Sequence, residues 1–408
     1  MYNLNSHYEN ILNLANSIIA GSKVVYLHPF GTTQPENVES IGFGDGNGML
    51  IIAYDQEPLD CYYNSYLLDS ILNDFRDADG ELRRMFILLN TEKQSVEKYK
   101  LSEKYVFNDC NYFFHALCAS DWYRGHKYNA KLIPIHERKL SKKFISLNRI
   151  TGNSRVYRSL LMSELVDVVD QGYISYSDRC PVHNEFYVDA IYNARKKYKL
   201  DHLYIDNAIQ QLNSLTPKYP LRIDHLDKQE IPNGSHTLDP INELMTSFLH
   251  VVTETMFWDD RTHLTEKIFK PIVAKQPFVL VGCPNNVEYL RSYGFKTFGK
   301  WWDEGYDAIT DPVERLTAVS LIIKDICNRP MNELEDMMAD MSEVLEYNFN
   351  WFYNPDFTDM VWNELKTNLS NCLWDYQVLH PKWWDDKSTW LSDARYIGSN
   401  LIKNGDNI

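Results

Sequence analysis

The stretch His263-Leu264-Thr265-Glu266-Lys267 is followed by an apolar run and then by Pro277-Phe278-Val279-Leu280-Val281-Gly282. The second segment predicts a short buried strand, because its apolar residues are consecutive and end at a glycine. We therefore expect an acid and a base side by side at the start of a helix, between this strand and an apolar strand upstream at 248–252. A strand, a helix and a strand in that order indicate a parallel sheet covered by helices.

The N-terminal part of the chain has the same alternation. Short apolar runs at 23–27, 49–54 and 85–89 predict strands, and 63–75 is a helical candidate. A further apolar run at 112–119 is either a strand or a buried helix. Because the chain has 408 residues and single cores stop growing at roughly 250 to 300, we predict an α/β fold with two Rossmann-like domains.

The domain boundary is expected near residue 140, where a charged segment leads into Phe144-Ile145-Ser146-Leu147. The predicted domains are 1–140 and 141–345, followed by a helical, tryptophan-rich tail at 346–408. Apolar periodicity then predicts the elements of the second domain. These are a helix over 155–169, a strand over 173–176, helices over 286–293 and 312–327, and loops with short helices over 177–240.

Composition limits the class of protein. A net charge of −15 argues against a surface that binds phosphate backbone all over, and 44% hydrophobic with 24% charged residues is typical of a soluble globular protein. The sequence contains no apolar run of the roughly 18 residues that a membrane span needs, so we predict a cytoplasmic protein with no transmembrane segment. Seven scattered cysteines predict buried free thiols.

One short span concentrates basic residues and contains no acid. Two interpretations are open: a solvated linker and helix face, or the edge of a cleft that binds a diphosphate. The residues are Arg138, Lys139, Lys142, Lys143, Arg149, Arg155 and Arg158.

The helix that starts near Thr265 has the chemistry of a phosphate site. Free backbone N–H groups at a helix start attract anions, and Lys267 adds a full positive charge, while Glu266 can accept hydrogen bonds from hydroxyls. Without context, an adjacent Glu and Lys on a helix are ordinary surface residues. Pro271 lacks the N–H that would bond to the Lys267 carbonyl, and so predicts a bend.

The context is a resemblance. The order Thr253-Glu254, a spacer, Thr265-Glu266-Lys267, a helix and the 277–282 strand resembles the donor-binding half of the alpha-1,3-fucosyltransferase family. Upstream, the strand that ends at Asn148 and the helix that Arg155 opens are similar to that family's strand, loop and arginine. The match covers roughly 144–176 and 248–298. Val169-Asp170-Gln171-Gly172 only partly matches the family's Val-Asp-x-x-Gly element, and Pro271 is not a usual feature. The pattern, including Gly294-Phe295-Lys296-Thr297-Phe298, is most similar to uncharacterised bacterial and phage glycosyltransferases.

The resemblance implies a GT-B fold and a metal-independent enzyme that uses a nucleotide-sugar donor as co-substrate and no other cofactor. It assigns Arg155 and Lys267 to the diphosphate, and Glu254 and Glu266 to ribose or sugar hydroxyls. Asn148, Arg149 and Thr265 complete the donor-binding set. In GT-B enzymes a terminal helix often crosses back to the first domain, which implies that the tail packs there.

The candidate base lies in Tyr54-Asp55-Gln56-Glu57-Pro58, directly after a predicted strand, where open sheets bind ligands. An inverting transferase needs a carboxylate to accept the proton of the acceptor hydroxyl, and Asp55 or Glu57 is the candidate. The alternative is a turn in which the aspartate bonds to nearby backbone. His28, His115 and Asp121 are candidates for acceptor contacts, although a lone histidine is more often structural.

Two other motifs carry less weight. The glycines from Gly42 to Gly48 mimic a dinucleotide fingerprint, but that motif needs a following helix and a strand follows here. The acid pairs Asp77 with Asp79 and Asp259 with Asp260 lie in polar turns beside arginines, so we predict no obligatory metal.

More than one acceptor and more than one class of protein remain open. A glycan acceptor suits the acidic charge, and a hydroxylated base in phage DNA would suit the basic span and the 27 tyrosines and 10 tryptophans, which can hold a flipped base. We favour the glycan. A non-catalytic nucleotide- or glycan-binding protein of the same fold is a second class, and a nucleotide-dependent oxidoreductase is disfavoured by the order of the glycine loop.

Overall fold

The computed structural model describes residues 3–27, 38–42, 48–59, 86–94, 107–125, 127, 132–180, 182–221, 238 and 240–379. The chain forms two compact units. The first unit contains Met1–Leu117 together with Thr358–Ile408, and the second contains Cys118–Phe357. Each unit has its own largely parallel sheet, so the chain is an α/β protein with two parallel-rich sheets and many helices.

The sheet of the first unit has the strand order β2-β1-β3-β4-β5. Its strands are β1 (Lys23–Leu27), β2 (Val38–Ile41), β3 (Leu50–Tyr54), β4 (Phe86–Asn90) and β5 (Asn108–Asn111). All neighbours pair in parallel except β1 and β2, which are antiparallel. Every residue of β3 and β4 is buried, as expected of central parallel strands that are covered on both faces. The predicted strands at 23–27, 49–54 and 85–89 are confirmed as β1, β3 and β4.

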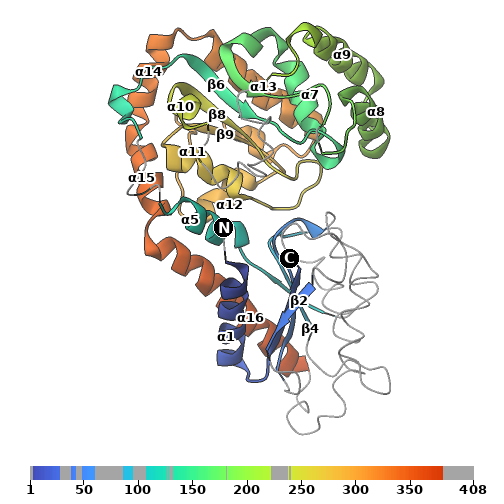
Figure 1. The fold of residues 1–408 in the computed structure, drawn as a ribbon, viewed down its shortest axis with the longest axis vertical. Coiled ribbons are helices and arrows are strands. Elements are labelled where there is room, and N and C mark those ends of the chain that lie inside the picture. The colour runs from blue at the N-terminus through green and yellow to red at the C-terminus, as the bar shows by residue number, and fades with distance from the viewer. Residues whose placement is uncertain are drawn as a thin grey trace. The chain divides into compact units, whose positions relative to one another are not determined.

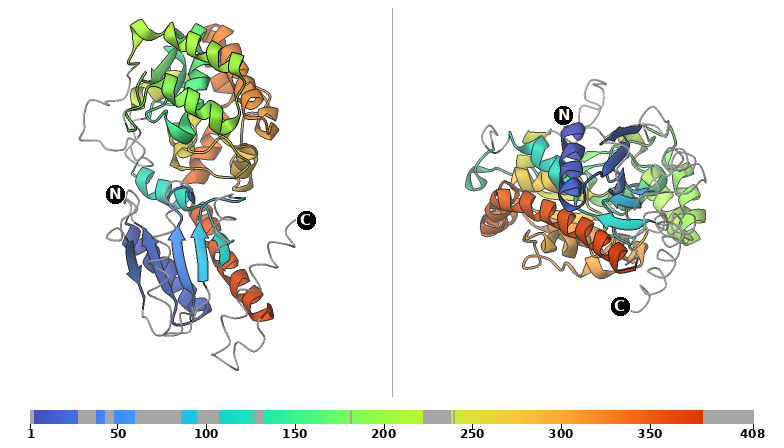
Figure 2. Two further views of the ribbon diagram at one scale, coloured as in Figure 1. Left: turned by 90° about the vertical axis from the view of Figure 1, so that its right-hand side faces the viewer. Right: turned by 90° about the horizontal axis from the view of Figure 1, so that it is seen from below.

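Two helices of the described part of the first unit flank this sheet. Helix α1 (Leu4–Ile18) packs beside β1 and β2 (Figure 2). Helix α16 (Pro355–Leu379) belongs to the first unit from Thr358 onward. The Asn368 amide donates to the Asn111 carbonyl at 2.7 Å, so α16 lies against β5. The helical candidate at 63–75 and residues 380–408 lie outside the described residues.

The second sheet is entirely parallel, with the order β7-β6-β8-β9. Its strands are β6 (Lys142–Leu147), β7 (Gly172–Ser175), β8 (Ser247–Thr253) and β9 (Phe278–Val281). Helices of this unit lie before its first strand, between its strands and after its last strand in the sequence. They are α5 (Phe114–Tyr123), which begins in the first unit, α7 (Tyr157–Glu164), α8 (Tyr187–Tyr198), α9 (His202–Asn213), α10 (Ile241–Met245), α11 (Phe269–Ala274), α12 (Asn286–Ser292), α13 (Pro312–Asn328), α14 (Met331–Asp340) and α15 (Ser342–Phe352).

The helices cover both faces of this sheet. The chain runs from β6 to β7 on one side and from β8 to β9 on the other, so right-handed crossovers place α7 and α11 on opposite faces. Helix α13 packs on β6 and β9 beside α7, whereas α10 packs on β8 beside α11 (Figure 1). This arrangement leaves the carboxyl ends of the four strands along one edge of the sheet.

The run at 112–119, for which a strand and a buried helix were both open, contains the start of helix α5 at Phe114. Two other local predictions need correction. The segment 177–240, expected to hold loops and short helices, contains two twelve-residue helices, α8 and α9. The expected helix over 155–169 is divided into α7 and two 3-10 turns, Asn153–Arg155 and Val166–Gln171.

The units divide at 117/118 and not near the predicted residue 140. The intervening segment packs on the second unit. The Arg138 guanidinium donates to the carbonyls of Ala274 and Lys275, both at 2.8 Å, and the Tyr123 carbonyl accepts from the Tyr353 hydroxyl at 2.6 Å. The charged segment near residue 140 is therefore not a linker between the units, because Arg138 donates hydrogen bonds to carbonyls of the second unit.

The cysteines within the described ranges are free and buried, as predicted. They are Cys110, Cys118, Cys180, Cys283, Cys327 and Cys372. None of the helices in the described part of the chain has the length and apolar character needed to cross a lipid bilayer.

Candidate functional site

The strand order of the second sheet reverses between β6 and β8, because the chain leaves these two neighbours in opposite directions. Open α/β sheets bind ligands at such a point, outside the carboxyl ends of the strands. Asn148 directly follows β6 and Glu254 directly follows β8. The Thr253 hydroxyl donates to the Asn148 amide oxygen at 2.8 Å and so joins the two strand ends.

Glu254 is fully buried and holds the turn that contains the sequence motif. Its carboxylate accepts the Thr265 backbone N–H at 3.3 Å and the Thr265 hydroxyl at 2.5 Å. Gly282 allows this close packing, since a β-carbon there would lie 2.7 Å from the Asn286 amide nitrogen and 3.4 Å from the Glu254 β-carbon. The sequence assigned Glu254 to ligand hydroxyls, whereas the structure uses both of its oxygens to position Thr265.

Thr265 caps a 3-10 turn, Glu266–Ile268, and its hydroxyl accepts the backbone N–H of Lys267 within that turn. The Lys267 ammonium donates to the hydroxyls of Thr265 at 3.0 Å and Thr255 at 3.2 Å, and to the Glu266 carboxylate at 3.3 Å. The Thr265 hydroxyl therefore donates one hydrogen bond and accepts others, which uses its full capacity. The Lys267 side chain is 33% exposed and that of Glu266 is 11% exposed, so Lys267 is held by three partners within a partly exposed position.

The helix after this turn begins later than predicted. Helix α11 starts at Phe269, so Pro271 lies in its first turn, where backbone N–H groups have no partner within the helix. Its missing N–H therefore removes no hydrogen bond of α11, and Lys267 belongs to the 3-10 turn that precedes this helix.

The loop after β6 carries the two predicted arginines. Arg149 is exposed, and Arg155 is half-buried as the last residue of the turn Asn153–Arg155 that precedes α7. Because β6 is next to β8, these cationic side chains come from the same edge of the sheet as Lys267.

Arg158 has a role that the sequence did not reveal. Its guanidinium is buried and donates to three carbonyls, those of Ile150 at 2.9 Å, Thr253 at 2.8 Å and Glu254 at 3.0 Å. It thus ties the loop after β6 to the end of β8. The only sequence signal was an arginine close to the apolar stripe of a predicted helix. The basic span is therefore not one solvated face, since Arg138 and Arg158 both bond to buried carbonyls.

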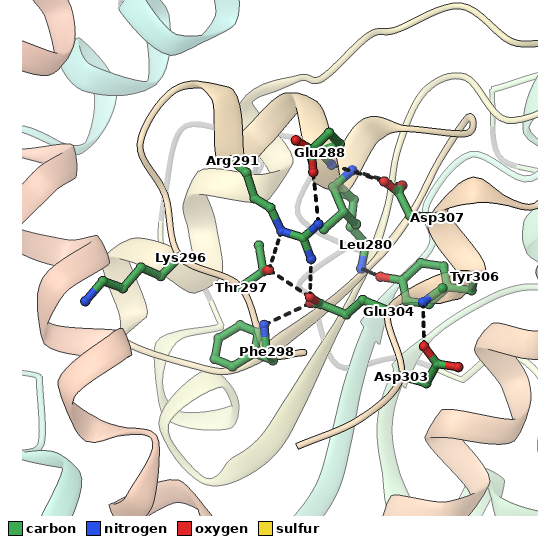
Figure 3. Close-up of polar contacts among 12 residues, drawn as sticks. Leu280, Glu288, Arg291, Lys296, Thr297, Phe298, Asp303, Glu304, Tyr306 and Asp307 are labelled. Atoms are coloured by element: carbon green, nitrogen blue, oxygen red, sulfur yellow. Dashed lines mark hydrogen bonds and ion pairs between the residues drawn. The ribbon is translucent and has the colours of Figure 1, made fainter. Parts of the chain in front are cut away.

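The start of α12, at the end of β9, is already occupied by a carboxylate. Asp307 accepts the backbone N–H groups of Val287 at 2.9 Å and Glu288 at 3.1 Å, and burial raises its pKa (Figure 3). Beside it, Glu304 accepts from Arg291, from the Thr297 hydroxyl at 2.7 Å and from the Phe298 N–H at 2.9 Å, so the 294–298 string forms part of a scaffold. The backbone N–H groups of Val287 and Glu288 at the start of α12 are therefore already bonded within the protein.

The first unit holds the predicted catalytic carboxylates at the end of β3. Asp55 is fully buried and accepts from the Tyr8 hydroxyl at 2.6 Å and from the Tyr112 hydroxyl. Burial raises the pKa of Asp55 from 3.8 to about 6, although both hydrogen bonds favour the ionised form. His7 bonds to the Tyr112 hydroxyl at 2.8 Å, and burial lowers its pKa to about 3. Asp55 thus belongs to an enclosed network.

The remaining predicted residues are dispersed. Glu57 is partly exposed, two residues beyond Asp55. His115 is buried and interacts electrostatically with Asp55, and Asp121 pairs with Arg124 at 2.9 Å. His28 lies outside the described residues, as do Asp77 and Asp79.

Asp259, from the second acid pair, binds Arg261 through two hydrogen bonds, of 2.9 and 2.7 Å. Among the described residues, no three or more His, Cys, Asp or Glu side chains form a group that could hold a metal ion.

Comparison of the chain with protein-family models, with curated proteins and with solved structures finds no match in any of the three.

Proposed function

We propose that this protein is a GT-B glycosyltransferase that transfers a sugar from a nucleotide-sugar donor, and that the donor binds at the carboxyl ends of β6 and β8. One observation carries the proposal. The Thr255 and Thr265 hydroxyls accept from the Lys267 ammonium in the connection that follows β8, one of the two strands between which the strand order reverses, and the Lys267 side chain is 33% exposed. A fixed cation at such an edge suits a diphosphate.

The proposed roles follow from charge. Lys267 and Arg155 bind the diphosphate, with Arg149 as a further cation, and Glu266 accepts hydrogen bonds from ribose or sugar hydroxyls. In the transfer, the acceptor oxygen bonds to the anomeric carbon as the bond from that carbon to the diphosphate oxygen breaks. The nucleoside diphosphate leaves with the bonding electrons, and the cations stabilise its added charge.

The acceptor proton needs a base, and we assign it to Glu57. The enclosed position of Asp55, with both oxygens bonded to tyrosines, favours Glu57 over Asp55. We keep a glycan as the proposed acceptor, because the net charge of −15 disfavours DNA.

The test uses calorimetric binding of nucleoside diphosphates and nucleotide sugars to the full chain. We expect Lys267→Ala to weaken binding at least tenfold, about 1.4 kcal/mol. Lys324→Ala is the matched control, because the Lys324 side chain is 32% exposed and also pairs with a carboxylate, that of Asp167 at 3.1 Å. Absence of binding to every nucleotide, or equal losses in the two variants, would show that the donor site is wrongly assigned.

Turnover is tested in the same preparations. Glu57→Gln is expected to leave donor binding within twofold and to lower transfer or donor hydrolysis by about 10²- to 10⁴-fold. Binding without any turnover, unaltered by Glu57→Gln, would instead identify a non-catalytic binding protein.

A further inference from the structure

Two aromatic side chains stack in parallel beside the candidate donor site. The rings of Trp258 and Tyr198 have centroids 4.0 Å apart and planes inclined by 8°. Trp258 lies four residues after Glu254, in the connection that leaves β8, and Tyr198 is the last residue of α8. The Trp258 indole N–H donates to the Ser154 carbonyl at 2.8 Å, which fixes the ring against the loop after β6.

The pair differs from the core aromatics next to it. Phe257 and Tyr157 also stack in parallel, at 4.3 Å and 12°, but both are fully buried. Trp258 is turned by 88° to Phe257, and Trp258 and Tyr198 are each partly exposed. Consecutive aromatic residues thus serve two purposes. Phe257 fills the core, whereas Trp258 lies partly exposed in the connection after β8 and stacks on Tyr198, over whose ring the Lys197 ammonium lies 5.2 Å from the centroid.

The pair is close along the chain to contacts of Lys267 and Arg155, the residues that we propose bind the diphosphate. The Lys267 ammonium bonds to the Thr255 hydroxyl, and Thr255 is three residues before Trp258, a separation of at most about 10 Å along the chain. Ser154, which anchors the indole, is followed directly by Arg155. Each cation is therefore connected through a few backbone bonds to a contact of the aromatic pair.

We propose that Trp258 and Tyr198 form a stacking platform for the nucleobase of the donor. This inference rests on the proposed function and adds the base to it. The diphosphate of the nucleotide lies at Lys267 and Arg155, and its base stacks on the aromatic pair. Aromatic stacking accepts any base because every base has a flat π-face, so the platform supplies affinity without selecting the nucleotide.

The test separates the base from the diphosphate by comparing two probes. Calorimetry on the full chain measures a nucleoside diphosphate and inorganic pyrophosphate, which carries the same phosphates without a base. Trp258→Leu is expected to weaken nucleoside diphosphate binding roughly 5- to 150-fold and to leave pyrophosphate within twofold. Trp258→Phe keeps a flat ring without the indole N–H, and is expected to retain most of the affinity.

The control is Trp301→Leu, because Trp301 is also partly buried and its N–H donates to Asp340 at 2.7 Å. It should change neither probe. If Trp258→Leu fails to fold, Tyr198→Leu at the end of α8 gives the same comparison.

The outcomes are distinguishable. Nucleoside diphosphate and pyrophosphate that both bind, with losses that are equal or absent in Trp258→Leu, overturn the platform alone. A wild-type chain that binds neither probe overturns the proposed function, and the platform with it. Loss confined to the nucleoside diphosphate supports both.

Discussion

Replacement of Asp55 by asparagine should change how the stability of the first unit depends on pH. Asp55 is fully buried between Tyr8 and Tyr112, and its pKa is raised from 3.8 to about 6, chiefly by burial. The folded unit therefore holds this proton more tightly than the unfolded chain does. The stability that Asp55 contributes is complete below pH about 4 and is lost as the pH rises through about 6.

The magnitude follows from the shift. About 2 pKa units at roughly 1.36 kcal/mol per unit give about 3 kcal/mol of stability lost between pH 4 and pH 7. His7 acts in the opposite sense, since its pKa is lowered to about 3 and its contribution is lost as the pH falls below 6.5. His7 is present in both proteins and cancels in the difference. We expect Asp55→Asn to be about 1 kcal/mol less stable than wild type at pH 4, because a hydrogen bond is altered, and about 2 kcal/mol more stable at pH 7.

The assay is amide hydrogen exchange by mass spectrometry on peptides from β3 and β4, corrected for intrinsic exchange at each pH. The ratio of protection factors between variant and wild type should change roughly a hundredfold from pH 4 to pH 7. Asp109→Asn is the control, because Asp109 is an exposed carboxylate on β5 of the same sheet and lacks the burial that raises the pKa of Asp55. A ratio for Asp55→Asn that stays constant with pH would refute the reasoning.

Two further changes test the packing of the second unit. Thr265→Val removes the hydroxyl that donates to Glu254 and accepts from Lys267. It should lower the free energy of unfolding, measured in urea, by about 1 to 3 kcal/mol and should weaken nucleoside diphosphate binding. Thr265→Ser keeps the hydroxyl and should change neither quantity. Gly172→Ala, at the start of β7, places a β-carbon against the ring of Phe144 and should lower the free energy of unfolding by about 1 to 3 kcal/mol. Gly125→Ala, with no atom within 4 Å of the added carbon, should leave it almost unchanged. Equal urea midpoints for the two variants would contradict the expected overlap.

The sequence predicted the strands that consist mainly of apolar residues. Strands β3, β4, β8 and β9 are buried along their whole length, and each contains the short apolar run by which the sequence marks it. Strand β5, Asn108-Asp109-Cys110-Asn111, carries no such signal. It forms because its backbone pairs with β4, with Asn108 opposite Ile87, and this pairing cannot be inferred from three polar residues and one cysteine.

The sequence predicted that several candidate residues lie at one edge of a sheet, but not the contacts that they make there. Residues that directly follow strands, such as Asn148 and Glu254, are expected at the carboxyl edge once the strands are known. Which charges remain exposed there depends on packing. Arg155 and Arg158 belong to the same basic span, yet Arg158 is buried against three carbonyls and Arg155 is half-exposed. The positive charge of the span cannot tell which arginine is buried and which is exposed, because both are arginines in the same basic segment.

The hydrogen bonds around Thr265 order the Lys267 side chain, which bears on the diphosphate site that we propose. A free lysine side chain loses roughly 2 kcal/mol of rotamer freedom when a ligand orders it. Here the ammonium is already ordered by the Thr265 hydroxyl, which is itself held by the buried Glu254 carboxylate. A diphosphate at this position would gain the charge without most of that entropic cost. In the proposed donor site, Glu254 would act through Thr265, and its loss should weaken diphosphate affinity although its buried carboxylate presents no charge to the ligand.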